Sequence, residues 1–256
     1  MPKRESEKGK NISESVMNLK KSVLNLAAIV AMSATISATA LAEDSPWSIS
    51  ASVLSTDLDT AETSSAPIAG VSRTLNIGTD TDTGFGISVG RTVFEQSLGR
   101  LRAELAYTNT DLDIENINFL GNDFSADAVG GDVEVESIFA RLVYQFELGK
   151  IDPYVGIGIG STDVDVNAVY GGSAGTSPGA QPPFVTDNDS ATSLEARIGV
   201  IYSVADNVDL FLEYSRTEAD DISLDRLGGG PGGLQTSTQE GDFEIDSIAF
   251  GVTYQF

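Results

Sequence analysis

The 256-residue sequence contains no cysteine and no histidine, and it carries a formal net charge of -23. The missing cysteine excludes disulfides and thiolate metal sites, and the missing histidine removes the commonest general base and transition-metal ligand. The acidity argues against a nucleic-acid partner, because phosphate binding needs clustered lysine and arginine. No run of about 18 apolar residues follows the N-terminal region, so a helical membrane protein is not expected.

The first 42 residues have the order of a secretory signal peptide. Lys20 and Lys21 precede an apolar stretch over 22–34, and small residues then lead to Ala42. We place cleavage after Ala42 and the start at Met17, so that residues 1–16 form an upstream extension and 43–256 the exported domain. A retained membrane anchor is the alternative, which the short apolar core disfavours.

Eight segments of the exported domain alternate bulky apolar residues with small or polar ones. This period of two predicts β-strands whose two faces meet different environments. Each segment is long enough for a tilted strand of about 9 to 11 residues to cross a bilayer. The predicted strands are 47–58, 81–94, 100–114, 132–148, 151–166, 191–205, 208–222 and 243–256.

The connections between these strands are alternately short and long. An up-and-down barrel then has three tight turns at one rim and four long loops at the other, as outer-membrane barrels have. We therefore predict an all-β fold, an eight-stranded antiparallel up-and-down transmembrane β-barrel. A soluble barrel such as a lipocalin would instead place its larger apolar residues inside. Tight turns are expected at 95–99, 149–150 and 206–207, and long polar loops around 59–80, 115–131, 167–190 and 223–242.

Aromatic residues gather toward the two ends of the predicted strands. Trp47, Tyr144 and Tyr202 fall near the tight-turn rim, and Tyr107 and Tyr214 fall near the other rim. Two such girdles around an aliphatic band are what lipid interfaces favour. These five residues are therefore predicted to lie at the lipid interface.

Charged residues occupy several inward positions of the predicted barrel. An eight-stranded barrel is just wide enough inside for side chains, and charges held there must be paired or hydrated. Our hypothesis is an arginine–glutamate network that plugs the lumen, while inward glycines make room for it. The alternative is that some of these charges lie near the rims in contact with water. The network residues are Arg102, Glu104, Arg141, Glu195, Arg197 and Glu213, and the glycines are 84, 86, 90, 156, 158 and 160.

Four closely spaced pairs of aspartates lie in or beside predicted strands, at 80 and 82, 111 and 113, 163 and 165, and 187 and 189. Carboxylates this close could bind Ca²⁺ or Mg²⁺ weakly. Their spacing does not match a calcium loop, so a solvated acidic rim is the favoured interpretation and no cofactor is predicted. Arg216, above Tyr214 on the outward face, is a candidate contact for a lipopolysaccharide phosphate.

The signal peptide, the eight alternating segments and the terminal Tyr254-Gln255-Phe256 resemble small outer-membrane β-barrels. The chain is similar to the transmembrane domain of outer membrane protein A and to opacity-type surface proteins. The resemblance implies a monomer in outer-membrane lipid and lipopolysaccharide, with periplasmic termini and extracellular long loops. It also implies insertion by the barrel-assembly machinery, which reads Tyr254 and Phe256 as the terminal assembly signal.

Three function classes remain open. A structural or surface-interaction role through the long acidic loops is favoured. A small-solute porin or channel is permitted by the inward glycines and opposed by the inward arginine–glutamate set. A lipid-modifying enzyme is opposed by the missing histidine, because the known acyl-cleaving barrels rely on a histidine with a serine or aspartate.

Overall fold

A computed structural model describes residues 47–65, 74–120, 128–171, 183–230 and 233–256. The predicted signal peptide, residues 1–42, lies outside them. The described residues contain no helix that is long and apolar enough to cross a membrane. The strands are β1 (Trp47–Ser65), β2 (Thr74–Thr79), β3 (Asp82–Gln96), β4 (Gly99–Leu120), β5 (Ala128–Phe146), β6 (Ile151–Gly171), β7 (Pro183–Ala205), β8 (Val208–Gly230) and β9 (Gly233–Gln255).

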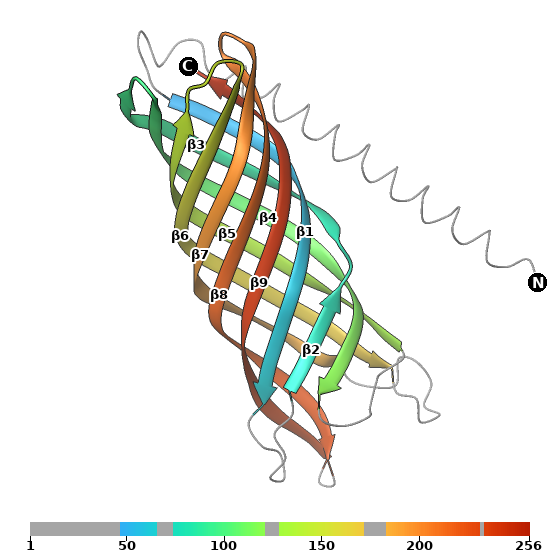
Figure 1. The fold of residues 1–256 in the computed structure, drawn as a ribbon. Helices are drawn as coiled ribbons and strands as arrows, with labels where there is room; N and C mark the ends of the chain where they lie inside the picture. Colours follow the sequence, from blue (N-terminus) through green and yellow to red (C-terminus); the bar gives the residue numbers. More distant parts are fainter. Residues whose placement is uncertain (1–46, 66–73, 121–127, 172–182, 231–232) are drawn as a thin grey trace, which may run out of the picture.

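The strands form one antiparallel sheet that closes on itself (Figure 1). Apart from β2 and β3, each strand pairs with the next strand in the sequence, and β9 returns to pair with β1 along most of its length. β2 and β3 both pair with β1 and β4, so together they occupy one strand position of the barrel. The barrel therefore has eight strand positions, which confirms the predicted eight-stranded up-and-down barrel.

The three short connections lie at one end of the barrel, which we call the tight-turn end. They span 97–98, 147–150 and 206–207, at the places predicted as 95–99, 149–150 and 206–207. The N–H of Phe256 donates to the Trp47 carbonyl at 3.0 Å, so β1 begins where β9 ends. Gly149 adopts a φ of 130°, a conformation that suits glycine in this turn. β1, β4, β6 and β8 end, and β5, β7 and β9 begin, at the opposite end of the barrel, which we call the long-connection end (Figure 1).

The strands continue well past their predicted limits toward the long-connection end. β8 reaches Gly230 rather than residue 222, and β9 begins at Gly233 rather than residue 243. The prediction of long polar loops was therefore wrong for the described parts of those segments. The alternation of apolar and polar residues continues there, but the apolar residues now face inward. A search for outward apolar residues therefore did not find these strands.

β5 shows where the polarity changes. From 138 to 146 the outward side chains are apolar, with Ile138 55% and Leu142 48% exposed. From 132 to 136 the outward side chains are Asp132, Glu134 and Glu136, while Val133 and Val135 are buried inside. We call the ring of outward apolar residues the apolar band and the acidic-faced part beyond it the extension.

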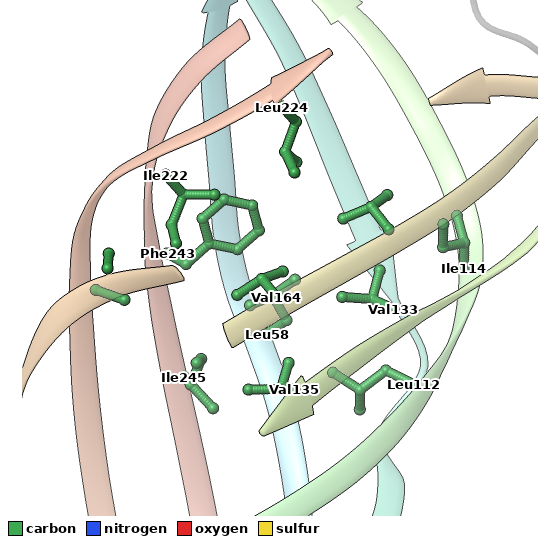
Figure 2. Close-up of a cluster of buried hydrophobic side chains, with 13 residues drawn as sticks. Leu58, Leu112, Ile114, Val133, Val135, Val164, Ile222, Leu224, Phe243 and Ile245 are labelled. Atoms are coloured by element: carbon green, nitrogen blue, oxygen red, sulfur yellow. The ribbon is translucent and has the colours of Figure 1, made fainter. Parts of the chain in front are cut away.

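The interior of the extension is an apolar cluster, shown in Figure 2. It draws side chains from seven strands, so it ties nearly the whole ring together. Burial of each large aliphatic side chain stabilises by about 1.5–3 kcal/mol. The extension is thus built like a soluble barrel, with apolar residues inside. The cluster consists of Leu58, Leu112, Ile114, Val133, Val135, Val164, Val166, Ala191, Ala219, Ile222, Leu224, Phe243 and Ile245.

Truncation of Phe243 should destabilise the extension far more than truncation of Phe250 on the same strand. The Phe243 ring is 0% exposed and Phe250 is 53% exposed, so only Phe243→Ala leaves a cavity. We expect Phe243→Ala to lower the free energy of unfolding by about 3–5 kcal/mol, measured by urea titration in micelles. Equal losses in Phe243→Ala and Phe250→Ala would contradict a packed apolar cluster.

Candidate functional site: the barrel lumen and the acidic extension

All six predicted network residues point into the lumen, where Arg197 is partly buried and the other five are buried. Arg102 Nη2 lies 2.8 Å from Glu104 Oε1, and Arg197 Nη1 lies 3.4 Å from Glu104 Oε2. Arg197 also pairs with Glu213 on β8. Side chains from β4, β7 and β8 are thus joined into one chain of charges across the lumen. The three positive and three negative charges balance one another, which burial requires.

The second part of the network is a two-point contact between Arg141 and Glu195. Arg141 Nε and Nη2 each donate to a Glu195 carboxylate oxygen at 2.6 Å. Arg141 comes from β5 and Glu195 from β7, so the pair reaches across β6. This planar geometry is the strongest form of a side-chain ion pair and fixes both partners.

Inward glycines give these long side chains their room. A Cβ at Gly158 would stand 3.0 Å from Glu195 Oε2 and 3.2 Å from Arg141 Cγ. A Cβ at Gly156 would stand 2.7 Å from Arg197 Cγ, and one at Gly90 would stand 3.0 Å from Glu104 Cγ. The arginine and glutamate stems therefore lie directly over the glycines of neighbouring strands, as the sequence indicated.

Tyr154 belongs to the network and was missed in the sequence. Its hydroxyl donates to Glu213 Oε2 at 2.5 Å, and the Arg197 guanidinium lies 5.8 Å from its ring centroid. Tyr154 is two residues before Gly156, so the same period of two places it inside. That parity could have identified it, but Tyr154 was not assigned to either face of its strand.

Polar groups also fill the tight-turn end of the lumen. Gln145 donates to Asp152 at 3.0 Å, and Asp152 accepts the backbone N–H of Leu148 and Gly149 at 2.8 and 3.1 Å. Arg100 donates to Gln145 Oε1 at 3.1 Å. This end of the lumen is therefore held by neutral amides as well as charges.

Hydroxyl groups separate the charged network from the apolar cluster. Ser137, Thr162 and Ser193 form a chain of hydrogen bonds of 2.9 and 2.8 Å across β5, β6 and β7. A cavity of about 50 Å³ lies at this level, bordered by Arg141 and Glu195. It has room for a few water molecules. From the tight turns outward, the lumen thus contains charged, hydroxylated and apolar layers.

The outward face of the extension is acidic on adjacent strands. Asp111 lies directly across from Glu134, which lies across from Asp165, and Glu136 lies across from Asp163. Like charges in directly opposite positions repel each other. Partial burial, together with the neighbouring carboxylates, raises the pKa of Asp111 and of Asp163. All five residues fall within the predicted strands 100–114, 132–148 and 151–166, and the structure confirms that they lie on strands.

The alternative of a weak cation contact and the hypothesis of a phosphate contact are not favoured by this geometry. In the described part of the chain, no three carboxylates are grouped so that they could hold a metal ion. Asp187 and Asp189 instead accept backbone N–H groups of β8. Arg216 pairs with Glu244 and lies 3.6 Å from Asp246. Its charge is thus neutralised, so the expected contact with a lipopolysaccharide phosphate is not supported.

Comparison with known families decides which class of barrel this is. A family model described as "Outer membrane protein beta-barrel domain" matches residues 26–256. The chain belongs to this family. It is an integral β-barrel protein of the bacterial outer membrane. No curated protein matches the sequence.

Solved structures of outer-membrane barrels share the fold. OprG from Pseudomonas aeruginosa matches with a TM-score of 0.56 and 16% identity, covering 82% of this chain and 96% of OprG. The outer membrane protease OmpT from Escherichia coli matches with a TM-score of 0.51 and 9% identity, covering 86% of this chain and 100% of OmpT. Neisserial surface protein A gives a TM-score of 0.48 at 17% identity, covering 83% of this chain and 98% of its own. Identities this low show the fold alone.

In this outer-membrane barrel the apolar band faces lipid, and the predicted interface aromatics lie at its two edges. Trp47, Tyr144 and Tyr202 point outward near the tight-turn end. Tyr107 and Tyr214 point outward at the other edge, where their hydroxyls donate to Glu136 at 2.7 Å and Asp246 at 2.6 Å. An apolar ring with a polar tip suits such a boundary.

The Tyr254 and Phe256 rings contact each other edge to face, with centroids 5.1 Å apart. Their side chains lie at the tight-turn end of β9, beside the start of β1. Their role as an assembly signal stays a prediction.

Loss of one partner of the Arg141–Glu195 pair should destabilise the barrel more than loss of both. Glu195→Gln leaves a buried guanidinium without its counter-charge, at a cost of about 3–5 kcal/mol. The double variant Arg141→Met/Glu195→Leu removes both charges and should recover most of that loss. Urea unfolding in micelles measures both, and additive losses would show that the two side chains do not interact.

Acidification should stabilise the extension, because the pKa values of Asp111 and Asp163 are raised in the folded state. The folded protein then binds more protons than the unfolded chain, so stability increases as the pH falls from neutral toward those raised values. The unfolding midpoint measured against pH reports this trend. In Asp111→Asn/Asp163→Asn the dependence should flatten, and an unchanged slope would refute the assignment.

Proposed function

We propose that this protein is a closed, non-conducting outer-membrane barrel that displays an acidic surface on the cell exterior. The observation that carries the proposal is the filled lumen, in which the ion-pair network is followed by a separate apolar cluster. A protein whose lumen is filled by two separate layers acts through its outer surface. The exposed part above the lipid is the acidic extension, so interaction through this surface is the role that we infer.

The proposal includes an orientation. We place the tight-turn end, with Trp47 and Phe256, in the periplasm and the extension outside the cell, after export by the signal peptide that ends at Ala42. Short periplasmic turns and longer extracellular connections are the usual arrangement in this class. The acidic outward residues support the boundary, since carboxylates facing lipid are unfavourable.

The chemistry of the extension indicates the kind of partner. Carboxylates at cross-strand positions, such as Glu134 and Asp165, favour partners with basic surfaces. Lipopolysaccharide phosphates carry the same sign of charge, so contact with them needs bridging divalent cations. We therefore propose a basic partner surface, and a monomeric barrel as the protein that meets it.

The two other functions find less support. A porin needs an open lumen, whereas Arg141, Glu195 and the apolar cluster occupy this one. A hydrolase of the acyl-cleaving kind needs a base, and the whole sequence lacks histidine. The likeness to a protease, OmpT, concerns the fold alone. We therefore propose that the protein is not an enzyme.

Conductance in planar lipid bilayers tests the closed lumen. The wild-type protein should give no stable open channel, because charged and apolar layers both block the path. Arg141→Ala/Glu195→Ala should remain closed as well, since the apolar cluster is untouched by these changes. Large stepwise conductance in the wild type would contradict the proposal, and a porin reconstituted in parallel shows that the bilayer reports openings.

Binding of a basic probe to intact cells tests the surface role and the orientation together. Fluorescent polylysine should bind cells that express the protein, and Glu134→Gln/Glu136→Gln/Asp163→Asn/Asp165→Asn should bind less at low salt. The difference should vanish as salt screens exposed charges beyond about 10 Å at 0.1 M. Equal binding by both proteins at low salt, at matched expression, would overturn the acidic surface as the site of interaction.

A further inference from the structure

The wall of the extension contains a break between β7 and β8. Ladder pairs run from Ala205 and Val208 to Ser193 and Ala219, and the next pair is Val185 with Arg226. Residues 186–192 of β7 therefore face residues 220–225 of β8 without a ladder pair. This is the longest interruption among the described strand pairs, and we call it the β7–β8 seam. The interruptions beside the β2–β3 break are shorter.

Two side chains take the place of the missing backbone acceptors. The N–H of Ser223 donates to Asp189 Oδ2 at 2.8 Å, and the N–H of Asp225 donates to Asp187 Oδ2 at 2.7 Å. On its other edge, β8 stays paired with β9, where Ser223 faces Glu240. Partly buried backbone N–H groups need acceptors, so these two carboxylates satisfy β8 where β7 has moved away.

The seam also holds unfavourable features. The pairing of β8 with β9 contains a bulge between Ala219 and Ile222. Within this bulge Asp221 has a φ of 62°, a left-handed conformation that side-chain-bearing residues rarely adopt. Its N–H donates to Asp242 Oδ1 on β9 at 3.2 Å, across the other edge of β8.

Directly inside the seam lies the β8 part of the apolar cluster. Ile222 is 0% exposed and Leu224 is 2% exposed, and both point into the barrel beside Phe243 (Figure 2). Other parts of the cluster stand behind a continuous ladder. Val164, for example, lies on β6, which is paired with β5 and β7 on both sides at that level.

We propose that the extension opens sideways along the β7–β8 seam, with Asp187 and Asp189 as the two clasps that hold it shut. Opening separates β7 from β8 and gives the outside access to Ile222 and Leu224, while the other joints stay paired. Opening therefore exposes apolar side chains on a surface that is acidic when closed. This inference is independent of whether the lumen conducts and of which partner binds the acidic face.

Cysteine accessibility tests the seam cleanly, because the natural chain contains no cysteine. Ile222→Cys and Val164→Cys each place a thiol in the apolar cluster, one behind the seam and one behind continuous ladders. We expect a small uncharged thiol reagent to label the folded Ile222→Cys protein in micelles at least about tenfold faster than Val164→Cys. Equal labelling rates would overturn the proposal.

The clasps are tested by adding Asp187→Ala/Asp189→Ala to each cysteine variant. Loss of both acceptors should raise labelling at position 222 by at least about tenfold, with position 164 unchanged. Asp187→Asn/Asp189→Asn keeps a carbonyl acceptor and should change the rate at 222 less. If the alanine pair accelerates both positions equally, the extension unfolds as a whole and the seam is not the opening.

Hydrogen exchange provides a measurement on the unsubstituted protein. The N–H groups of Ser223 and Asp225 should exchange faster than the paired N–H groups of the β5–β6 ladder at the same level. Slower or equal exchange at Ser223 and Asp225 would show that the seam stays shut, even if the cysteine variants fail to fold.

Discussion

Closure of the sheet into an eight-stranded barrel is the constraint on which the rest of the structure depends. Closure removes the free edges of the sheet and sends every second side chain into an interior that is only as wide as side chains themselves. Whatever lies there must fit and must satisfy its own polarity. The long Arg141 and Arg197 side chains are possible because Gly158 and Gly156 on β6 have none.

The barrel extends from lipid into water. At that boundary the apolar side chains change from the outer face of the sheet to the inner face. In the apolar band the bulky residues face lipid and the charges face one another inside. In the extension the carboxylates face water and the bulky residues form the apolar cluster. Both parts obey one rule, that apolar surface avoids water and buried charge needs a partner. The lumen is closed as a result, because each part fills the interior with its own chemistry.

Much of this architecture could be predicted from the sequence. The outward apolar residues of the eight strands, the inward charges and the tight turns all follow from a period of two. The outer part of the extension was missed for a physical reason. Segments such as Ser223-Leu224-Asp225 were assigned to a polar loop, because their polar residues suggested solvent, although Leu224 between them is buried in the barrel interior. Partner choice within the lumen could not be predicted, since Arg197 bonds Glu213 and Glu104 across different strands. The seam depends on register, which the sequence does not reveal where both faces change polarity.

At the edge of the apolar band the apolar side chains change from the outer face of the sheet to the inner face, and spin labels along β5 test this change most directly. Single labels at each position from 132 to 146 in lipid bilayers report collision with oxygen, which concentrates in lipid, and with a water-soluble nickel complex. The account predicts that outward positions from 138 to 146 collide mainly with oxygen and that 132, 134 and 136 collide mainly with nickel. Inward positions such as 133 and 143 should be protected from both. Oxygen-dominated collisions at 132 to 136, or nickel-dominated collisions throughout, would contradict it.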